Sequence, residues 1–116
     1  MDVVLKPGRE ASLLARHPWV FAGAIQAVTG TPASGETVNF VSARGQWLAR
    51  GAYSPHSQIR VRAWTFAPDE QIDTAFFQTR LEAALALRRE LGFVQPGRAF
   101  RLCNAENDGL PGVVID

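Results

Sequence analysis

The stretch from residue 59 to residue 66 alternates basic or aromatic side chains with apolar ones. Successive side chains of a β-strand point to opposite faces, so a strand here would place Arg60, Arg62 and Trp64 on one face. Guanidinium groups beside an aromatic ring can hold the phosphates and unpaired bases of a single-stranded nucleic acid. The alternative interpretation is a solvated arginine pair that flanks a partly buried Trp64. The opposite, apolar face would carry Ile59, Val61, Ala63 and Thr65.

Basic residues are concentrated in the first part of the chain. Residues 1–67 contain seven lysines and arginines against three acidic residues, whereas residues 68–116 contain five against eight, although the whole chain has a net charge of +1. An arginine-rich module can bind the phosphates of a polyanion, and the acidic module is a poor candidate for this. The solubility of an ordinary surface explains the asymmetry equally well.

The other residue types that could do chemistry are few. Glu106 and Asp108 could form a general acid/base pair or a cation site, but carboxylates in a Gly/Pro-rich turn more often form the turn itself, and this is our main interpretation. The single cysteine, Cys103, excludes an internal disulfide. With His17 and His56 as the only histidines, no spacing typical of a metal site is present.

Short strands and turns must position the basic residues. Residues 3–5 predict a first strand, residues 9–16 predict one or two helical turns with Leu13 and Leu14 facing inward, and residues 24–28 predict a weak strand. Trp19, Val20 and Phe21 are interpreted as a core plug, with an exposed Trp19 that stacks on a base as the alternative.

A hairpin is predicted between residues 36 and 53. The alternation in residues 36–41 places Val38 and Phe40 on one face, and Ala43–Gly45 forms the turn into a second strand at residues 46–53. Gly51 inside that strand predicts a β-bulge or the close approach of another backbone.

The composition changes at residues 67–70, which we take as a domain boundary. A helix is predicted from an N-cap at Asp73 to Leu91, with Gly92 as its end. Its stripe consists of Phe76, Phe77, Leu81, Ala84, Leu85 and Arg88. Arg88 and Arg89 would complement the helix dipole without any ligand. Residues 99–103 and 113–116 predict strands. Because the last one would stop in its middle, we expect an N-terminal piece of a longer protein.

The composition favours a soluble, cytoplasmic protein with a core of its own. Apolar residues make up 47% of the chain, and no run approaches the roughly eighteen residues that a membrane-spanning helix needs. The first residues do not predict a secretory signal.

Four ordered motifs carry a resemblance to a known family. They are LKPGR at residues 5–9, RHPWVF at 16–21, LARGAYSPHSQIRVR at 48–62 and ENDGLPG at 106–112. Together they resemble the N-terminal part of the bacterial ribosomal RNA large-subunit methyltransferase I family, whose members use S-adenosylmethionine to make 5-methylcytosine in large-subunit ribosomal RNA.

The resemblance implies a β-rich α+β fold. A PUA-like RNA-binding pseudobarrel would occupy residues 1–67, with its Gly-x-x-Val turn at Gly35–Val38, and residues 68–116 would begin a middle α+β domain. The motifs of the Rossmann-like catalytic domain do not occur in this sequence. We therefore expect neither cofactor binding nor catalysis by this chain alone, with S-adenosylmethionine as the cofactor of the full-length protein. The family's nucleophile is a cysteine in another motif, and Cys103 is interpreted as a buried structural thiol.

The resemblance and the charge pattern together predict the RNA-binding residues. Ribosomal RNA would be the partner, and phosphate contacts would position it. The alternatives are a scaffold or homodimerisation module without RNA contact, or a turn at residues 106–112 that completes an enzyme site with a later domain. The predicted contacts are Lys6, Arg9, Arg16, Arg50, Arg60 and Arg62, with His17, Tyr53 and Trp64 as stacking or hydrogen-bonding candidates.

Overall fold

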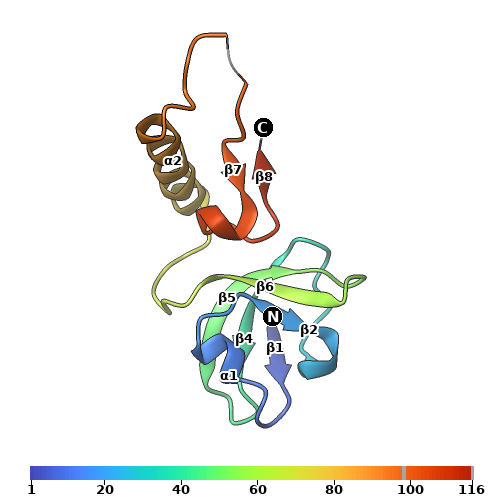
Figure 1. The fold of residues 1–116 in the computed structure, drawn as a ribbon. Helices are drawn as coiled ribbons and strands as arrows, with labels where there is room; N and C mark the ends of the chain where they lie inside the picture. Colours follow the sequence, from blue (N-terminus) through green and yellow to red (C-terminus); the bar gives the residue numbers. More distant parts are fainter. Residues whose placement is uncertain (98, 116) are drawn as a thin grey trace. The chain divides into compact units, whose positions relative to one another are not determined.

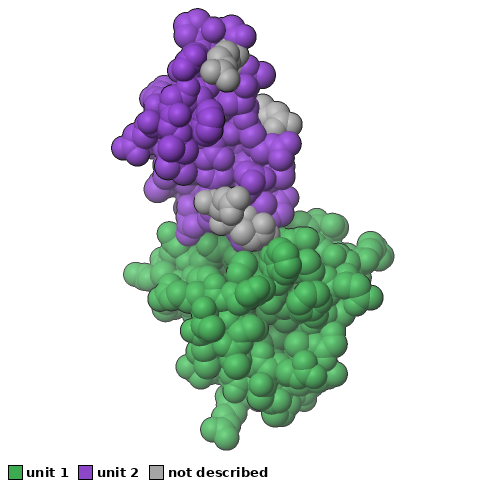
Figure 2. Space-filling model, viewed as in Figure 1, with its two compact units in different colours: residues 1–72 green, residues 73–116 purple. Residues whose placement is uncertain are grey.

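The computed structural model describes residues 1–97 and 99–115, and the side chains of residues 106 and 107 lie outside the description. The chain divides into two compact units, Met1–Ile72 (unit 1) and Asp73–Asp116 (unit 2), which Figure 2 colours separately. The division between these compact units follows Ile72, and the domain boundary that we predict from the composition follows residue 67.

Unit 1 is built around one six-stranded sheet (Figure 1). The strands are β1 Asp2–Leu5, β2 Trp19–Phe21, β3 Ile25–Val28, β4 Thr37–Val41, β5 Trp47–Tyr53 and β6 Ile59–Thr65. Their order in the sheet is β2-β6-β5-β4-β1-β3, and β1 pairs parallel with β4 while the other neighbours are antiparallel. A short helix α1 (Ala11–Leu14) and a 3-10 turn (Ala22–Ala24) complete the unit.

One face of this sheet forms the hydrophobic core. The predicted alternation in β4 and β6 is confirmed, because Val38, Phe40 and Val61 are almost completely buried. Ile59, which was predicted on the same face, is only half-buried. The core cluster consists of Val3, Leu5, Leu13, Val20, Val38, Phe40, Leu48, Ala49, Tyr53, Val61 and Ala63.

One of the two alternatives predicted for Gly51, the close approach of another backbone, is confirmed. The pairing of β5 with β6 also shifts register between Arg50 and Gly51, where one step along β5 corresponds to two steps along β6, so the extra residue lies on β6. A methyl group on Gly51 would lie 2.0 Å from the carbonyl oxygen of Arg62, so the two backbones approach as closely as glycine permits.

Two predictions about the segment before β3 were wrong in part. Leu13 is buried, but Leu14 is 62% exposed, because α1 is a single turn and presents only one side to the sheet. Of the three residues predicted to plug the core, only Val20 is buried in it. Successive side chains of β2 point to opposite faces of the sheet, so Trp19 and Phe21 point away from the core.

Unit 2 consists of helix α2 (Thr74–Glu90), strands β7 (Cys103–Asn104) and β8 (Val114–Ile115), and a 3-10 turn (Ala105–Asp108). The helix starts as predicted, with the Asp73 carboxylate accepting a hydrogen bond from the Phe76 amide at 2.9 Å, and Gly92 follows its end at a φ of +77°. β7 and β8 pair antiparallel and are shorter than the predicted strands. Within the described part of the chain, no helix is long and apolar enough to span a membrane.

Candidate nucleic-acid interface

The outer face of β2 and β6 carries the predicted basic and aromatic side chains of unit 1. Arg60, Arg62 and Trp64 are half-buried there, opposite the core residues of the same strand, as the alternation predicted. In the sheet, Arg62 of β6 has Trp19 of β2 as its neighbour on one side and Ala52 of β5 on the other. Of these two cross-strand neighbours, Trp19 is the larger.

His17 and Trp19 form an aromatic pair at the end of this face. The Trp19 amide donates a hydrogen bond to Nδ1 of His17 at 3.2 Å, and the two rings meet edge to face with centroids 5.7 Å apart. Because Nδ1 accepts this bond, a neutral imidazole carries its proton on Nε2, and exposed His17 can therefore donate from that atom. The pair thus combines an aromatic surface with a hydrogen-bond donor.

Arg16 owes its position to the way α1 ends. It adopts a left-handed φ of +62°, and the following His17 amide returns to the Ser12 carbonyl at 2.8 Å, which closes the helix. The Arg16 guanidinium lies 5.6 Å from the ring centroid of Phe66, just beyond the end of β6. This contact places a third cation along the strand that carries Arg60 and Arg62.

A groove of about 280 Å³ lies between α1 and β2. Its lining includes Arg9, Ser12, Trp19 and Phe21, and the Phe21 side chain is 51% exposed. A guanidinium, a hydroxyl group and two aromatic rings around one hollow are a suitable lining for a base with its attached phosphate. Part of this lining comes from the Trp-Val-Phe run after Pro18, which we predicted mainly as buried core residues.

Three of the predicted cations have no protein partner for their charged groups within the described residues. Lys6 and Arg9 are exposed on the turn between β1 and α1, and Arg62 lies on the outer face of β6. None of them forms an ion pair or a side-chain hydrogen bond with another described residue. A cluster of unneutralised cations on one unit attracts a polyanion.

Two predicted contacts have other roles, and a third is partly engaged. The Arg50 guanidinium donates to Asn39 Oδ1 at 3.1 Å and to backbone carbonyls of the linker, so its donors are used inside unit 1. Tyr53 is only 8% exposed and belongs to the core cluster, so its ring offers no face for stacking. Arg60 uses Nε to hold the Ser57 carbonyl at 3.1 Å.

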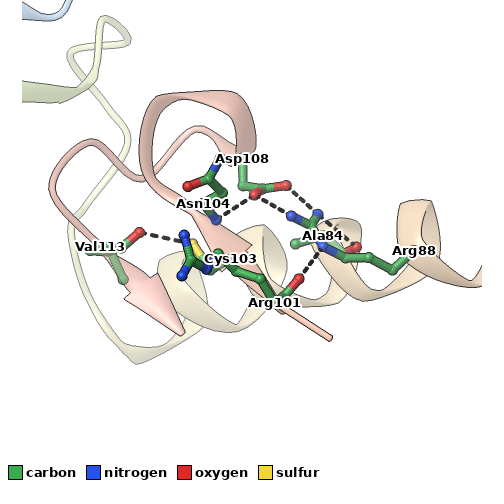
Figure 3. A network of polar contacts seen from close by, with 7 residues as sticks. All are labelled: Ala84, Arg88, Arg101, Cys103, Asn104, Asp108 and Val113. Carbon is green, nitrogen blue, oxygen red and sulfur yellow. Dashed lines mark hydrogen bonds and ion pairs between the residues drawn. The ribbon is translucent and has the colours of Figure 1, made fainter. Parts of the chain in front are cut away.

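Unit 2 contains a buried ion pair that we did not predict (Figure 3). Nη1 and Nη2 of Arg88 donate to the two carboxylate oxygens of Asp108 at 2.6 and 2.8 Å, and the Asn104 amide donates to the same carboxylate at 2.7 Å. Arg88 Nε also donates to the Arg101 carbonyl at 2.7 Å. The pair joins α2 to the 3-10 turn, and dipole compensation alone does not account for Arg88.

The electrostatics of the pair follow from this geometry. The hydrogen bonds from Arg88 lower the pKa of the Asp108 carboxyl, although its burial opposes them. Asp108 in turn raises the pKa of Arg88. A carboxylate held this firmly in the ionised form is a poor proton donor, which favours the structural interpretation of Asp108 over the acid/base one. The signal in the sequence was an arginine on the apolar stripe of the helix, which needs a partner when buried.

Cys103 is buried, as expected for a structural thiol. It has no exposed surface, its Sγ lies 3.4 Å from the Val113 carbonyl oxygen, and burial raises the pKa of the thiol. Its raised pKa disfavours the thiolate form that a nucleophile needs. Among the described residues, no group of three or more His, Cys, Asp or Glu side chains could hold a metal ion. The Glu106 side chain, a candidate from the sequence, lies outside the described residues.

The strand order and the chain's similarity to a known family model define its class. The model of the PUA-like domain matches residues 3–66, and the chain belongs to this family. The β-rich α+β fold expected from the sequence is thereby confirmed, with a PUA-like sheet followed by one long helix and a small two-stranded sheet.

Individual relatives place this domain within a longer protein. A protein of Alteromonas mediterranea named Ribosomal RNA large subunit methyltransferase I is 54% identical over 115 residues, which are 99% of this chain and 29% of that protein. A protein of the same name from Escherichia coli is 54% identical over 114 residues, again 29% of its length. The chain thus corresponds to the N-terminal PUA-like part of that family and spans less than a third of its curated relatives.

Solved structures share the fold at low sequence identity. A protein assigned as a SAM-dependent methyltransferase from Streptococcus mutans matches 98% of this chain with a TM-score of 0.75 at 13% identity, over 29% of its own length. A methyltransferase complexed with SAH matches with a TM-score of 0.76, also at 13% identity. At this identity the likeness establishes the fold alone.

Proposed function

We propose that unit 1 binds ribosomal RNA and positions it for a methyltransferase domain in another part of a longer protein. The observation that carries the proposal is a set of cations of unit 1 without protein partners among the described residues: Arg9 lines the groove at Trp19, Arg62 is paired with Trp19 in the sheet, and Lys6 is exposed on the turn before α1. Lys6, Arg9 and Arg62 have no partner carboxylate among the described residues, and the Arg16 guanidinium contacts the aromatic ring of Phe66. Such groups are suited to phosphate oxygens.

Phosphate and base contacts would have separate roles in this interface. The guanidinium and ammonium groups would fix the position of the RNA backbone without reading its sequence. His17 and Trp19 would contact an unpaired base by stacking and through the Nε2 donor of His17. Trp64 and Arg60 lie on the same outer face and would extend the contact along β6, whereas Arg50 and Tyr53 are left out of the proposed set.

The relatives support a proposal about the longer protein. Curated proteins that share 54% identity with this chain are named as ribosomal RNA large subunit methyltransferases, and a solved structure with the same fold is complexed with SAH. We infer that the longer protein transfers a methyl group from S-adenosylmethionine to carbon 5 of a cytosine in that RNA. The residues described in this chain would bind RNA, and none is assigned to the cofactor or to the methyl transfer.

Unit 2 would be the first part of a larger α+β domain in the longer protein. Its described residues leave several large apolar side chains exposed, and the groove along α2 is lined by Phe77, Leu81, Leu85 and Leu102. A unit this small cannot cover such a surface itself. A homodimer that covers this face is the rival proposal. The exposed apolar residues of unit 2 are Leu87, Leu91, Phe93, Val94 and Val114.

The proposal is tested by the salt dependence of RNA affinity. The Arg9→Ala/Arg62→Ala variant should bind single-stranded RNA more weakly, and the slope of log affinity against log salt should fall by about 1 to 2, because each lost phosphate contact releases fewer counterions. His17→Ala should weaken binding with the slope unchanged, since it removes a base contact. Arg89→Ala is the control, as Arg89 is exposed on α2 of unit 2 and lies outside the proposed interface.

Two outcomes would contradict this function. An unchanged salt slope in the double variant would remove the proposed surface from RNA binding. No measurable RNA affinity in the parent chain, together with a dimer in light scattering, would favour the scaffold or homodimer instead.

A further inference from the structure

The linker that leaves β6 folds back on unit 1 instead of continuing freely to α2. The Ala67 amide donates to the Thr65 hydroxyl oxygen at 3.1 Å, and the Glu70 amide donates to the Ala67 carbonyl at 3.1 Å. The Thr65 hydroxyl donates in turn to the Glu70 carboxylate. Residues 65–70 therefore form a closed turn at the end of the last strand.

Arg50 fastens this turn to the sheet. Its Nη1 donates to the Glu70 carbonyl and its Nη2 to the Pro68 carbonyl at 3.4 Å, while its Nε donates to Asn39 Oδ1 at 3.1 Å. Asn39 Oδ1 also accepts a hydrogen bond from Trp47 Nε1 at 3.1 Å, and the Arg50 guanidinium lies 5.2 Å from the centroid of the Trp47 ring. The guanidinium is therefore held by β4 and β5 on one side and holds the linker on the other.

We propose that Arg50 is a clamp that keeps residues 67–70 on unit 1, so that any change in the direction of unit 2 must occur after Glu70. The compact unit extends to Ile72, although the matched PUA-like domain ends at residue 66, and α2 is capped by Asp73. Without the clamp, this turn would keep its own hydrogen bonds but lose its attachment to β4 and β5, and the free tether would begin closer to β6. A shorter tether restricts the volume that the attached part can explore and raises its effective concentration at bound RNA. The clamp itself does not depend on RNA binding.

The chemistry of the contact favours arginine specifically. Two carbonyls and one amide oxygen are bound by three N–H groups that a planar guanidinium presents in fixed directions. A lysine would keep the charge, but its single ammonium group cannot reach all three acceptors with the same geometry. Arg50→Lys should therefore hold the linker more weakly than arginine but more firmly than alanine. The variant keeps the positive charge and removes the planar guanidinium, so it measures how much the geometry of the contact contributes.

Limited proteolysis with a glutamate-specific endoprotease tests the clamp in the intact chain. Arg50→Ala should be cleaved after Glu70 about tenfold faster than the parent, because opening of the turn no longer breaks hydrogen bonds to a charged group. Arg50→Lys should lie between the two. Cleavage after Glu36, in the exposed loop before β4, is the internal control, and Arg44→Ala is the matched arginine variant.

Amide hydrogen exchange separates a clamp from a general contribution to stability. If Arg50→Ala speeds hydrogen exchange at the Ala67 and Glu70 amides and leaves the exchange rates in β4, β5 and β6 as in the parent, the result supports the proposal. Equal acceleration across those strands, in Arg50→Ala and in the milder Arg50→Lys variant alike, would show that Arg50 only stabilises the sheet and would overturn it. Unchanged cleavage after Glu70 in a folded Arg50→Ala protein would also overturn it.

Discussion

The two units are stabilised in different ways. Unit 1 has a cluster of buried apolar side chains from five of its strands and α1, and its cations lie outside that core. Unit 2 buries Phe76, Ala84, Cys103 and Leu110 and adds an ion pair in which the Asp108 side chain is only 3% exposed. Apolar burial is spread over many residues, whereas an ion pair depends on both of its members. Unit 1 should therefore tolerate the loss of a single charge, and unit 2 should not.

The largest expected effect is the loss of unit 2 in Arg88→Ala. Removal of the guanidinium leaves the Asp108 carboxylate buried without its partner, which typically costs about 3–5 kcal/mol and exceeds what a unit this small can lose. The amide signals of α2 should collapse toward random-coil values in NMR spectra while those of unit 1 persist.

The neighbouring helix residue is the control for this variant. Arg89→Ala, at an exposed position of the same turn, should leave both units folded. If unit 2 kept its dispersed signals in Arg88→Ala, the contrast between the two units would be wrong.

The next largest effect should fall on unit 1 and on its backbone. Gly51→Ala would bring a methyl group against the Arg62 carbonyl where β5 and β6 approach, and the strands must separate at a cost of about 3 kcal/mol. Urea titration of unit 1 signals measures this loss. Gly23→Ala is the matched control, because nothing lies within 4 Å of the position that its new methyl group would take, and equal stabilities of the two variants would contradict the close approach.

Acid should produce a smaller and graded effect that is confined to unit 2. Asp108 has a lowered pKa in the folded state, so its contribution is present above the unfolded pKa of about 4 and is lost as the pH falls through the folded value. The stability of unit 2 should therefore be level between pH 5 and pH 7 and should fall progressively below about pH 4. In Asp108→Asn, which no longer titrates, this acid-dependent loss should shrink; an identical acid profile in that variant would contradict the assignment.

Local patterns predicted the parts of the fold that depend on local rules. Alternation in β6, the close backbone approach at Gly51 and the Asp73 cap each follow from a few neighbouring residues, and the structure confirms them. Leu14 and Phe21 were wrongly predicted to be buried, because the direction of these side chains depends on how α1 and β2 pack against the rest of the sheet. That information lies in β5 and β6, far along the chain.

The candidate site was harder to predict, because residue type does not show which partner an arginine meets. Arg50 and Arg62 look equivalent in the sequence, yet Arg50 is engaged by the linker and Arg62 has no partner among the described residues. Arg88 likewise finds its partner twenty residues away, at Asp108. The apolar stripe of α2 indicates that Arg88 needs a partner, but no local pattern reveals which residue that partner is.

The order of strands in unit 1 also determines when this unit can form during synthesis. β1 lies between β3 and β4, and β2 has β6 as its neighbour. The first strands to leave the ribosome must therefore wait for later ones, and β2 cannot be covered until Ile59–Thr65 has emerged. From this strand order we expect the complete sheet of the nascent chain to form only when nearly the whole unit is outside the exit tunnel.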